Sequence, residues 1–205
     1  LNMADRQIIA SAKSLTTRND LAIGVSNAID LLLKQWSGPR DNISLVSLST
    51  TLATNAVVES VGGAVCLVLI GFDEEMAGRA GLKEARGSDP ILHLDGGHKT
   101  DGSAQAPLDE TALIEALADI QGQVSSFAVA SLFATRNAEH EKRVRDILRE
   151  KTGLPVTCSH ELSSSLGGPR RALTALLNAR LISLLERLII ATEQVMVDCQ
   201  LECPL

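Results

Sequence analysis

The sequence predicts an α/β fold in which a largely parallel sheet is flanked by helices. Short aliphatic runs alternate with segments of helical spacing, which is the pattern of parallel strands joined by helical crossovers. The runs contain few polar residues, as expected for strands buried on both faces. The 205-residue chain is 45% hydrophobic but only 2% aromatic. Aliphatic side chains must therefore supply the core, and the length suits one large domain or two small ones.

The first half of the chain is predicted to begin with a hairpin strand and to continue with a helix and two further strands. Residues 7–13 are expected to be the hairpin strand. A helix follows from Leu21, because apolar residues recur there at helical spacing until Ser37. The aliphatic runs at residues 43–48 and 64–70 predict strands, and the second is fully aliphatic, which favours a central position in the sheet.

In the second half, strands and helices continue to alternate after a weaker stretch that follows residue 70. The helix at 107–123 starts with proline and acidic residues, and the last helix is apolar around much of its circumference. The expected elements are a short helix at 74–80, a strand at 91–94, a helix at 107–123, a strand at 127–132, an amphipathic helix at 138–151, a strand at 155–158 and a long helix at 170–199.

The stretch ISLVSLSTTLATNAVVE is the first candidate for a functional site. Ser49, Thr50 and Thr51 directly follow the strand at residues 43–48, and Thr54 and Asn55 lie in the first turns of a predicted helix that ends near residue 60. Side-chain hydroxyls at this position cap helices. Ligands of parallel α/β sheets also bind there, at the carboxyl ends of the strands. Both interpretations stay open from the residues alone.

Other predicted loops carry polar residues to the same edge of a parallel sheet. Arg136, Asn137 and His140 follow the strand at 127–132, and His160 follows the strand at 155–158. The alternatives are local caps, a surface ion pair for Arg136, and an ordinary exposed helix start at His140 and Glu141.

A polar stripe lies on the last helix. Arg171, Thr174 and Asn178 are spaced by three and four residues, so they share one face. Buried polar groups need hydrogen-bond partners, and a structural role is favoured here over catalysis.

Composition and missing motifs exclude several classes of function. The net charge is −6 and the basic residues are scattered, which argues against nucleic-acid binding. No signal peptide and no run of about 18 uncharged apolar residues is present. The four cysteines lack a zinc-ligand pattern, so a reduced, cytoplasmic location is the simplest interpretation. No metal site is predicted, since His93 and His98 fit a solvated hairpin better. No phosphate-binding loop or nucleophile elbow occurs, and the catalytic residues stay unassigned.

Three segments in order resemble the N-terminal region of the hydantoinase/oxoprolinase family, found in the A subunit of hydantoin-utilisation enzymes. They are SLSTTLATNAVVESVGGAVCLVLIGFDE, SLFATRNAEHEKRVRDIL and HELSSSLGGPRRALTALLNARL. The matching residues are Thr50, Thr51, Thr54, Asn55, Ala56, Gly63, Gly71, Phe72, Asn137, His140, Glu141, Arg171, Thr174, Asn178 and Ala179. Because the resemblance runs along nearly the whole chain, residues 1–205 are interpreted as one such region.

The resemblance implies a ribonuclease-H-like core of the actin-like ATPase type. It implies ATP-dependent opening of a cyclic amide, such as a hydantoin or 5-oxoproline, through a phosphorylated intermediate. ATP and Mg²⁺ are the implied cofactors, a second (B-type) subunit or domain is the implied partner, and a homo-oligomer is compatible with it. ATP-dependent ketone carboxylases are relatives, so the substrate stays open.

One departure limits what the resemblance implies. The family's glycine-rich Gly-x-Asp-x-Gly-Gly-Thr loop does not occur in this sequence. The chain is therefore interpreted as a fragment truncated at both ends, inactive alone, that keeps part of the cleft wall. The alternative is a non-catalytic scaffold or docking domain that presents the helix at residues 138–151, and a sugar-kinase-like relative is a third interpretation.

Overall fold

The computed structural model describes residues 7–15, 17, 21–48, 62–120 and 122–205. The chain divides into two compact units. The first contains residues 1–52 and 185–205, and the second contains residues 53–184. Each unit is described by itself, and the long last helix contributes to both.

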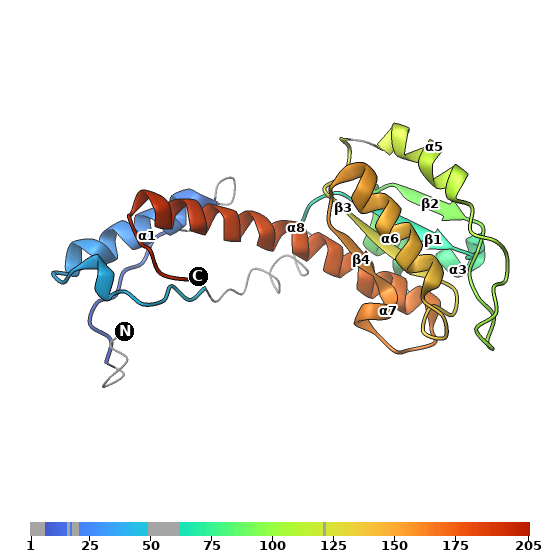
Figure 1. The fold of residues 1–205 in the computed structure, drawn as a ribbon, viewed down its shortest axis with the longest axis horizontal. Helices are drawn as coiled ribbons and strands as arrows, with labels where there is room; N and C mark the ends of the chain where they lie inside the picture. Colours follow the sequence, from blue (N-terminus) through green and yellow to red (C-terminus); the bar gives the residue numbers. More distant parts are fainter. Residues whose placement is uncertain (1–6, 16, 18–20, 49–61, 121) are drawn as a thin grey trace. The chain divides into compact units, whose positions relative to one another are not determined.

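The second unit is built on a four-stranded, all-parallel sheet in the order β2-β1-β3-β4 (Figure 1). Its strands are β1 (Val65–Ile70), β2 (Ile91–Leu94), β3 (Ser126–Ser131) and β4 (Val156–Cys158). The expected α/β class and the central position of β1 are therefore confirmed. In the register of the sheet Ile70 is level with Leu94 and Ser131, so β1, β2 and β3 end side by side at one edge.

Helices cover both faces of this sheet (Figure 1). On one face lie α5 (Glu110–Ile120) and α6 (Glu139–Thr152), and the first half of α8 (Gly168–Asp198) covers the other. Short helices complete the unit: α3 (Glu74–Ala77), α4 (Leu82–Arg86) and α7 (Ser159–Leu162).

The aliphatic composition of β1 follows from this layering. Cys66, Val68 and Ile70 pack under α5 and α6, whereas Val65, Leu67 and Leu69 pack under α8, and all six side chains are fully buried. Successive side chains of a strand point to opposite faces, so a strand covered on both sides needs apolar residues at every position. The helix α8 meets the sheet through small residues, namely Ala172, Ala175 and Ala179.

The first unit packs α1 (Leu21–Gln35) against the end of α8. Val25, Ile29 and Leu33 of α1 contact a buried cluster that contains Val195 and Met196. A 3-10 turn, η1 (Arg40–Asn42), leads into residues 43–48. No helix among the described residues is both long enough and apolar enough to cross a bilayer.

Two predicted strands are wrong. Residues 7–13 and 43–48 have no strand structure. In the second segment Ile43 and Val46 pack inward, but Leu45 and Leu48 are 57% and 39% exposed. The physical reason is that none of the described residues pairs with this segment as a strand, since the Val46 amide donates to the Pro204 carbonyl (3.0 Å) rather than to a sheet.

Candidate functional site

The loops that follow the strands of the second unit meet at the carboxyl edge of the sheet. The amide of Gly71 donates to the Leu94 carbonyl (2.9 Å), and the amide of Leu132 donates to the Ile70 carbonyl (3.0 Å). The amide of His98 donates in turn to the Leu132 carbonyl (3.1 Å). Backbone hydrogen bonds thus join the loops after β1, β2 and β3. This edge is where ligands bind in open parallel sheets.

A fully buried carboxylate, Glu141 in the first turn of α6, is the centre of the polar structure at this edge. Its Oε1 accepts hydrogen bonds from the Ser131 amide (2.7 Å) and the Ser159 hydroxyl (2.6 Å). Its Oε2 accepts from the His160 amide (3.0 Å) and contacts His160 Nδ1 at 2.6 Å. Four donors therefore fix one carboxylate between the ends of β3 and β4. The interpretation of His140 and Glu141 as an exposed helix start is wrong, because both side chains are buried.

Arg171 of α8 extends the same network from the opposite face of the sheet. Its guanidinium donates to the Ser131 carbonyl (2.7 Å), the Ser159 hydroxyl (3.3 Å) and the Ser165 carbonyl (2.8 Å). The side chain is only 1% exposed. Burial lowers the pKa of the Arg171 guanidinium, and the Glu141 charge opposes that effect. Arg171 therefore contacts the polar loops directly.

Glu141, Cys158 and His160 place three potential metal ligands within 4.8 Å of one another. The two carboxylate oxygens are already occupied by four donors. Burial raises the pKa of the Cys158 thiol to about 12, so its sulfur stays protonated and lies 3.6 Å from the Glu141 carbonyl. Mg²⁺ prefers oxygen ligands with several waters. This cluster fits a hydrogen-bonded network and does not fit a magnesium site.

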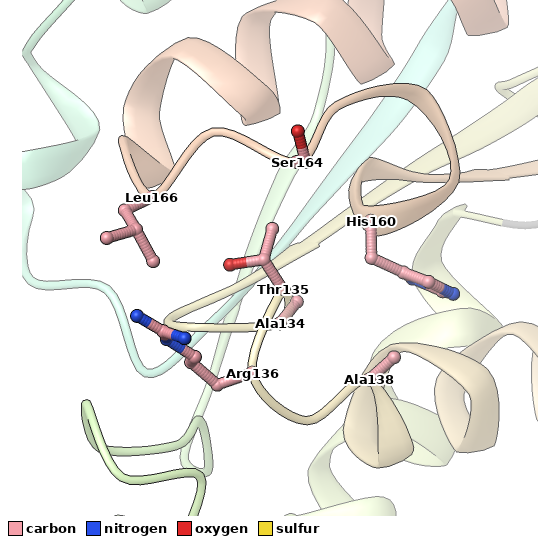
Figure 2. Close-up of a pocket in the computed structure, with 7 residues that line it drawn as sticks. All are labelled: Ala134, Thr135, Arg136, Ala138, His160, Ser164 and Leu166. Atoms are coloured by element: carbon pink, nitrogen blue, oxygen red, sulfur yellow. The ribbon is translucent and has the colours of Figure 1, made fainter.

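A pocket of about 550 Å³ opens beside this network (Figure 2). Its lining comes from the loop after β3, the start of α6 and the segment after β4: Ala134, Thr135, Arg136, Ala138, His160, Ser164 and Leu166. Figure 2 shows Thr135 between Arg136 and Ser164, whereas the His160 ring points away from them. The Thr135 hydroxyl is buried and has no hydrogen-bond partner among the described residues. Arg136 therefore lies at the edge of the sheet, as the sequence predicted. Thr135, which the sequence analysis did not single out, also lines the pocket.

The rings of two histidines pack against each other, tilted by 39°, beside the start of α6. The rings of His98 and His140 have centroids 4.3 Å apart, and the Gly97 amide donates to His140 Nδ1 (3.0 Å). Neither ring nitrogen of His98 has a partner among the described residues, although the side chain is 1% exposed. Burial lowers the pKa of both imidazoles. His93 is exposed as expected, but it lies in the parallel strand β2 and not in a hairpin. The expectation of a solvated residue is wrong for His98, which the packing against His140 buries.

The other predicted site residues have separate structural contacts. Asn137 accepts from the Glu139 amide (3.0 Å) and donates to the Gly102 carbonyl (3.3 Å). Thr174 is exposed and donates to the Arg170 carbonyl (3.0 Å) of its own helix. Asn178 contacts the Thr157 hydroxyl at 3.5 Å. The polar stripe of α8 therefore does not converge on one site.

The hydroxyl-rich turn lies outside the described residues. Thr50, Thr51, Thr54 and Asn55 stay predictions. Sequence reasoning missed Ser131, Ser159 and the buried role of Glu141. The only signal for Glu141 was its place in the Asn-x-x-His-Glu pattern of the family.

The parallel sheet and its polar edge define an α/β domain of the kind that carries a ligand cleft. The chain belongs to the hydantoinase/oxoprolinase N-terminal region family, whose model matches residues 2–152. It is 29% identical over 204 residues to the acetophenone carboxylase gamma subunit of Aromatoleum aromaticum (strain DSM 19018 / LMG 30748 / EbN1), covering 83% of this chain and 28% of that protein. It is also 29% identical over 157 residues to the caprolactamase subunit alpha of Pseudomonas jessenii, covering 68% of this chain and 23% of that protein.

Two solved structures share the fold. The ATP-dependent caprolactamase from Pseudomonas jessenii superposes with a TM-score of 0.67 at 24% identity, covering 89% of this chain and 30% of that one. A nucleotide-free acetone carboxylase, from a study of ATP-dependent acetone carboxylation, superposes with a TM-score of 0.57 at 20% identity, covering 90% of this chain and 31% of that one. The chain thus spans between a quarter and a third of the length of most of these relatives.

Proposed function

We propose that this chain is part of an ATP-dependent enzyme that opens a cyclic amide, and that the carboxyl edge of its sheet forms part of the reaction cleft. The observation that carries the proposal is the likeness to a caprolactamase subunit and to the ATP-dependent caprolactamase structure, because a lactam is a cyclic amide. The balanced reaction consumes one amide, two waters and one ATP and yields the ring-opened acid, ADP and phosphate; this acid is an amino acid from a lactam and an N-carbamoyl amino acid from a hydantoin. Residues 153–205 belong to the same proposed region, since α8 covers one face of the sheet.

The described residues contribute a cleft wall and a fixed polar scaffold to this proposal. The pocket at the edge of the sheet has no carboxylate in its lining, and the oxygens of Glu141 are fully occupied. These side chains therefore do not form a Mg²⁺ site, and no step of ATP chemistry is assigned to them. ATP and Mg²⁺ belong to the proposed enzyme as a whole. A partner subunit also belongs to it, because both curated relatives are named as subunits.

An ATP-dependent ketone carboxylase is the second candidate. It is favoured by the likeness to the acetophenone carboxylase gamma subunit and to the acetone carboxylase structure. The two candidates consume ATP with different second substrates. The hydrolase needs a cyclic amide and water, and the carboxylase needs a ketone and bicarbonate.

The hydrolase and the carboxylase can be distinguished by measuring the ADP that the complete enzyme, with its partner subunit, releases in the presence of each substrate. We expect ADP release to depend on a cyclic amide, tested with hydantoin, 5-oxoproline and caprolactam, and the corresponding ring-opened acid to appear in equal amount. Dependence on acetone or acetophenone with bicarbonate would instead identify the carboxylase. If neither the cyclic amides nor the ketones with bicarbonate cause ADP release, the scaffold or docking interpretation is favoured.

The hydroxyl-rich turn is tested in the same enzyme. The double variant Thr50→Ala, Thr51→Ala should lose turnover while its melting temperature stays near that of the wild type. Normal turnover with a stability loss of about 1 kcal/mol per residue would mean that these residues only cap a helix.

A further inference from the structure

The pocket at the carboxyl edge contains a cation without a counter-charge. Arg136 has no ion pair and no side-chain hydrogen bond among the described residues, and the surface ion pair considered from the sequence is not found there. Four other arginines of the same unit pair with carboxylates, namely Arg79 with Glu75, Arg143 with Glu110, Arg145 with Glu161, and Arg180 with Asp89. Arg86, Arg149 and Arg171 donate instead to backbone carbonyls. An arginine that lines a pocket without such a partner favours a bound anion.

The residue before Arg136 supplies an independent sign of a ligand. The Thr135 hydroxyl is buried at the pocket and lacks a partner among the described residues. A buried donor without an acceptor costs about 1–3 kcal/mol, so proteins seldom keep one that nothing satisfies. A ligand oxygen in the pocket would accept from this hydroxyl and from the Arg136 guanidinium together.

The loop that carries these two residues is held in one conformation. Phe133 has a φ of 48°, in the left-handed region, and its carbonyl accepts from the amides of Arg136 (2.8 Å) and Asn137 (3.2 Å). Ala134 is buried beneath the turn. Because these hydrogen bonds form within the turn and need no ligand, they lower the ordering entropy that opposes binding.

Charge and shape narrow the class of ligand. One cation and no carboxylate line the pocket, so a monoanion is matched better than a phosphate dianion. Ala134, Ala138 and Leu166 give the pocket an apolar side, and a volume of about 550 Å³ suits a small molecule.

We propose that this pocket binds a small aliphatic carboxylate, whose oxygens pair with the Arg136 guanidinium and the Thr135 hydroxyl while its alkyl chain lies against Leu166. Binding of the carboxylate needs no ATP and no turnover, so this proposal can be tested independently of the reaction proposed above. A phosphate-binding subsite would share the same oxyanion contacts but would not use the apolar side.

Sodium butyrate and inorganic phosphate are the probes, titrated at constant ionic strength and followed by amide chemical shifts of Thr135, Arg136 and Ala138. We expect butyrate to shift these amides saturably and to bind at least about tenfold more tightly than phosphate. Arg136→Gln and Thr135→Val should each weaken butyrate binding by about tenfold or more. Lys83→Gln on α4 makes the same charge change away from the pocket and should bind as the wild type does.

The melting temperatures of the variants show whether a loss of binding comes from unfolding. Arg136 is exposed and the Thr135 hydroxyl has no partner to lose, so both variants should melt at or above the wild-type temperature. Equal butyrate binding by the wild type and Arg136→Gln, or no saturable shift at all, would overturn the proposal. Phosphate binding as tight as butyrate binding would overturn the assignment to a carboxylate.

Discussion

Replacing Glu141 by glutamine tests whether the buried carboxylate holds the edge of the sheet together. The substitution keeps the shape of the side chain but replaces one oxygen by an amide NH₂ group. Each carboxylate oxygen accepts from one backbone amide and one side chain: Ser131 and Ser159 at Oε1, and two groups of His160 at Oε2. In either orientation of the glutamine amide, its NH₂ group faces a backbone N–H. Both groups are hydrogen-bond donors, and a backbone N–H cannot act as an acceptor.

The expected loss follows from counting these bonds. One buried backbone N–H loses its acceptor, at a cost of about 1–3 kcal/mol. The two donors that keep an oxygen lose the charge assistance of a carboxylate, which is worth about 1 kcal/mol each. The free energy of unfolding should therefore fall by about 3–5 kcal/mol, as in other broken buried ion networks. Arg171 adds to the loss, because it lies in the same network.

Urea denaturation followed by far-UV circular dichroism measures this change. Fluorescence would report on the wrong part, because the single tryptophan, Trp36, belongs to the first unit. With an m value of about 2 kcal/mol/M, the midpoint should fall by roughly 1.5–2.5 M. The matched control is Glu139→Gln, which removes the same charge from an exposed residue of the same helix and should cost about 1 kcal/mol or less. A Glu141→Gln loss below about 1 kcal/mol with an unchanged m value, or a control loss of equal size, would refute the reasoning.

Three further predictions concern the pH dependence, the backbone and the thiols. Because burial lowers the pKa of His98 and of His140, the unfolded chain binds protons first, so stability should fall as the pH drops below the ordinary value of 6.5; urea midpoints between pH 7.5 and 5 should show this slope, and His98→Leu should reduce it while the contribution of His140 remains. Gly96→Ala should lower the melting temperature more than Gly81→Ala, because only the Gly96 Cβ would come within 2.7 Å of a β1 side chain; equal losses would contradict this. Burial raises the pKa of Cys158 to about 12, so a thiol reagent should modify the less buried Cys203 first in the native protein and Cys158 only on unfolding; rapid native labelling of Cys158 would contradict it.

The sheet could be predicted because its strands depend on a local property. Residues 64–70 and 127–132 are apolar at nearly every position, and only burial on two faces accounts for such runs. Residues 43–48 contain four apolar residues of six and predicted a strand equally well. Their structure depends on a partner strand, which no local pattern reports, and the two inward residues, Ile43 and Val46, are three apart rather than two.

The candidate site was predictable only in its position along the chain. Arg136 and His140 were placed at the edge because loops after parallel strands must emerge there. Apart from the family pattern, nothing in the sequence identified Glu141, since an acidic residue in the first turn of a helix usually faces water and stabilises the helix dipole. The Glu141 carboxylate can be buried because Ser131, at the end of β3, and Ser159, directly after β4, both donate hydrogen bonds to it.

Arg171 connects the buried network to the pocket. The family resemblance pointed to this residue as a cleft residue, yet it does not line the pocket. Its guanidinium instead donates to the carbonyl of Ser165 (2.8 Å), and the neighbours of that residue, Ser164 and Leu166, form one wall of the pocket. The opposite wall follows β3, whose last carbonyl, that of Ser131, binds the same guanidinium (2.7 Å). One buried arginine thus fixes the spacing between both walls. Arg171 therefore affects ligand binding indirectly, by holding the backbone of the two walls in position.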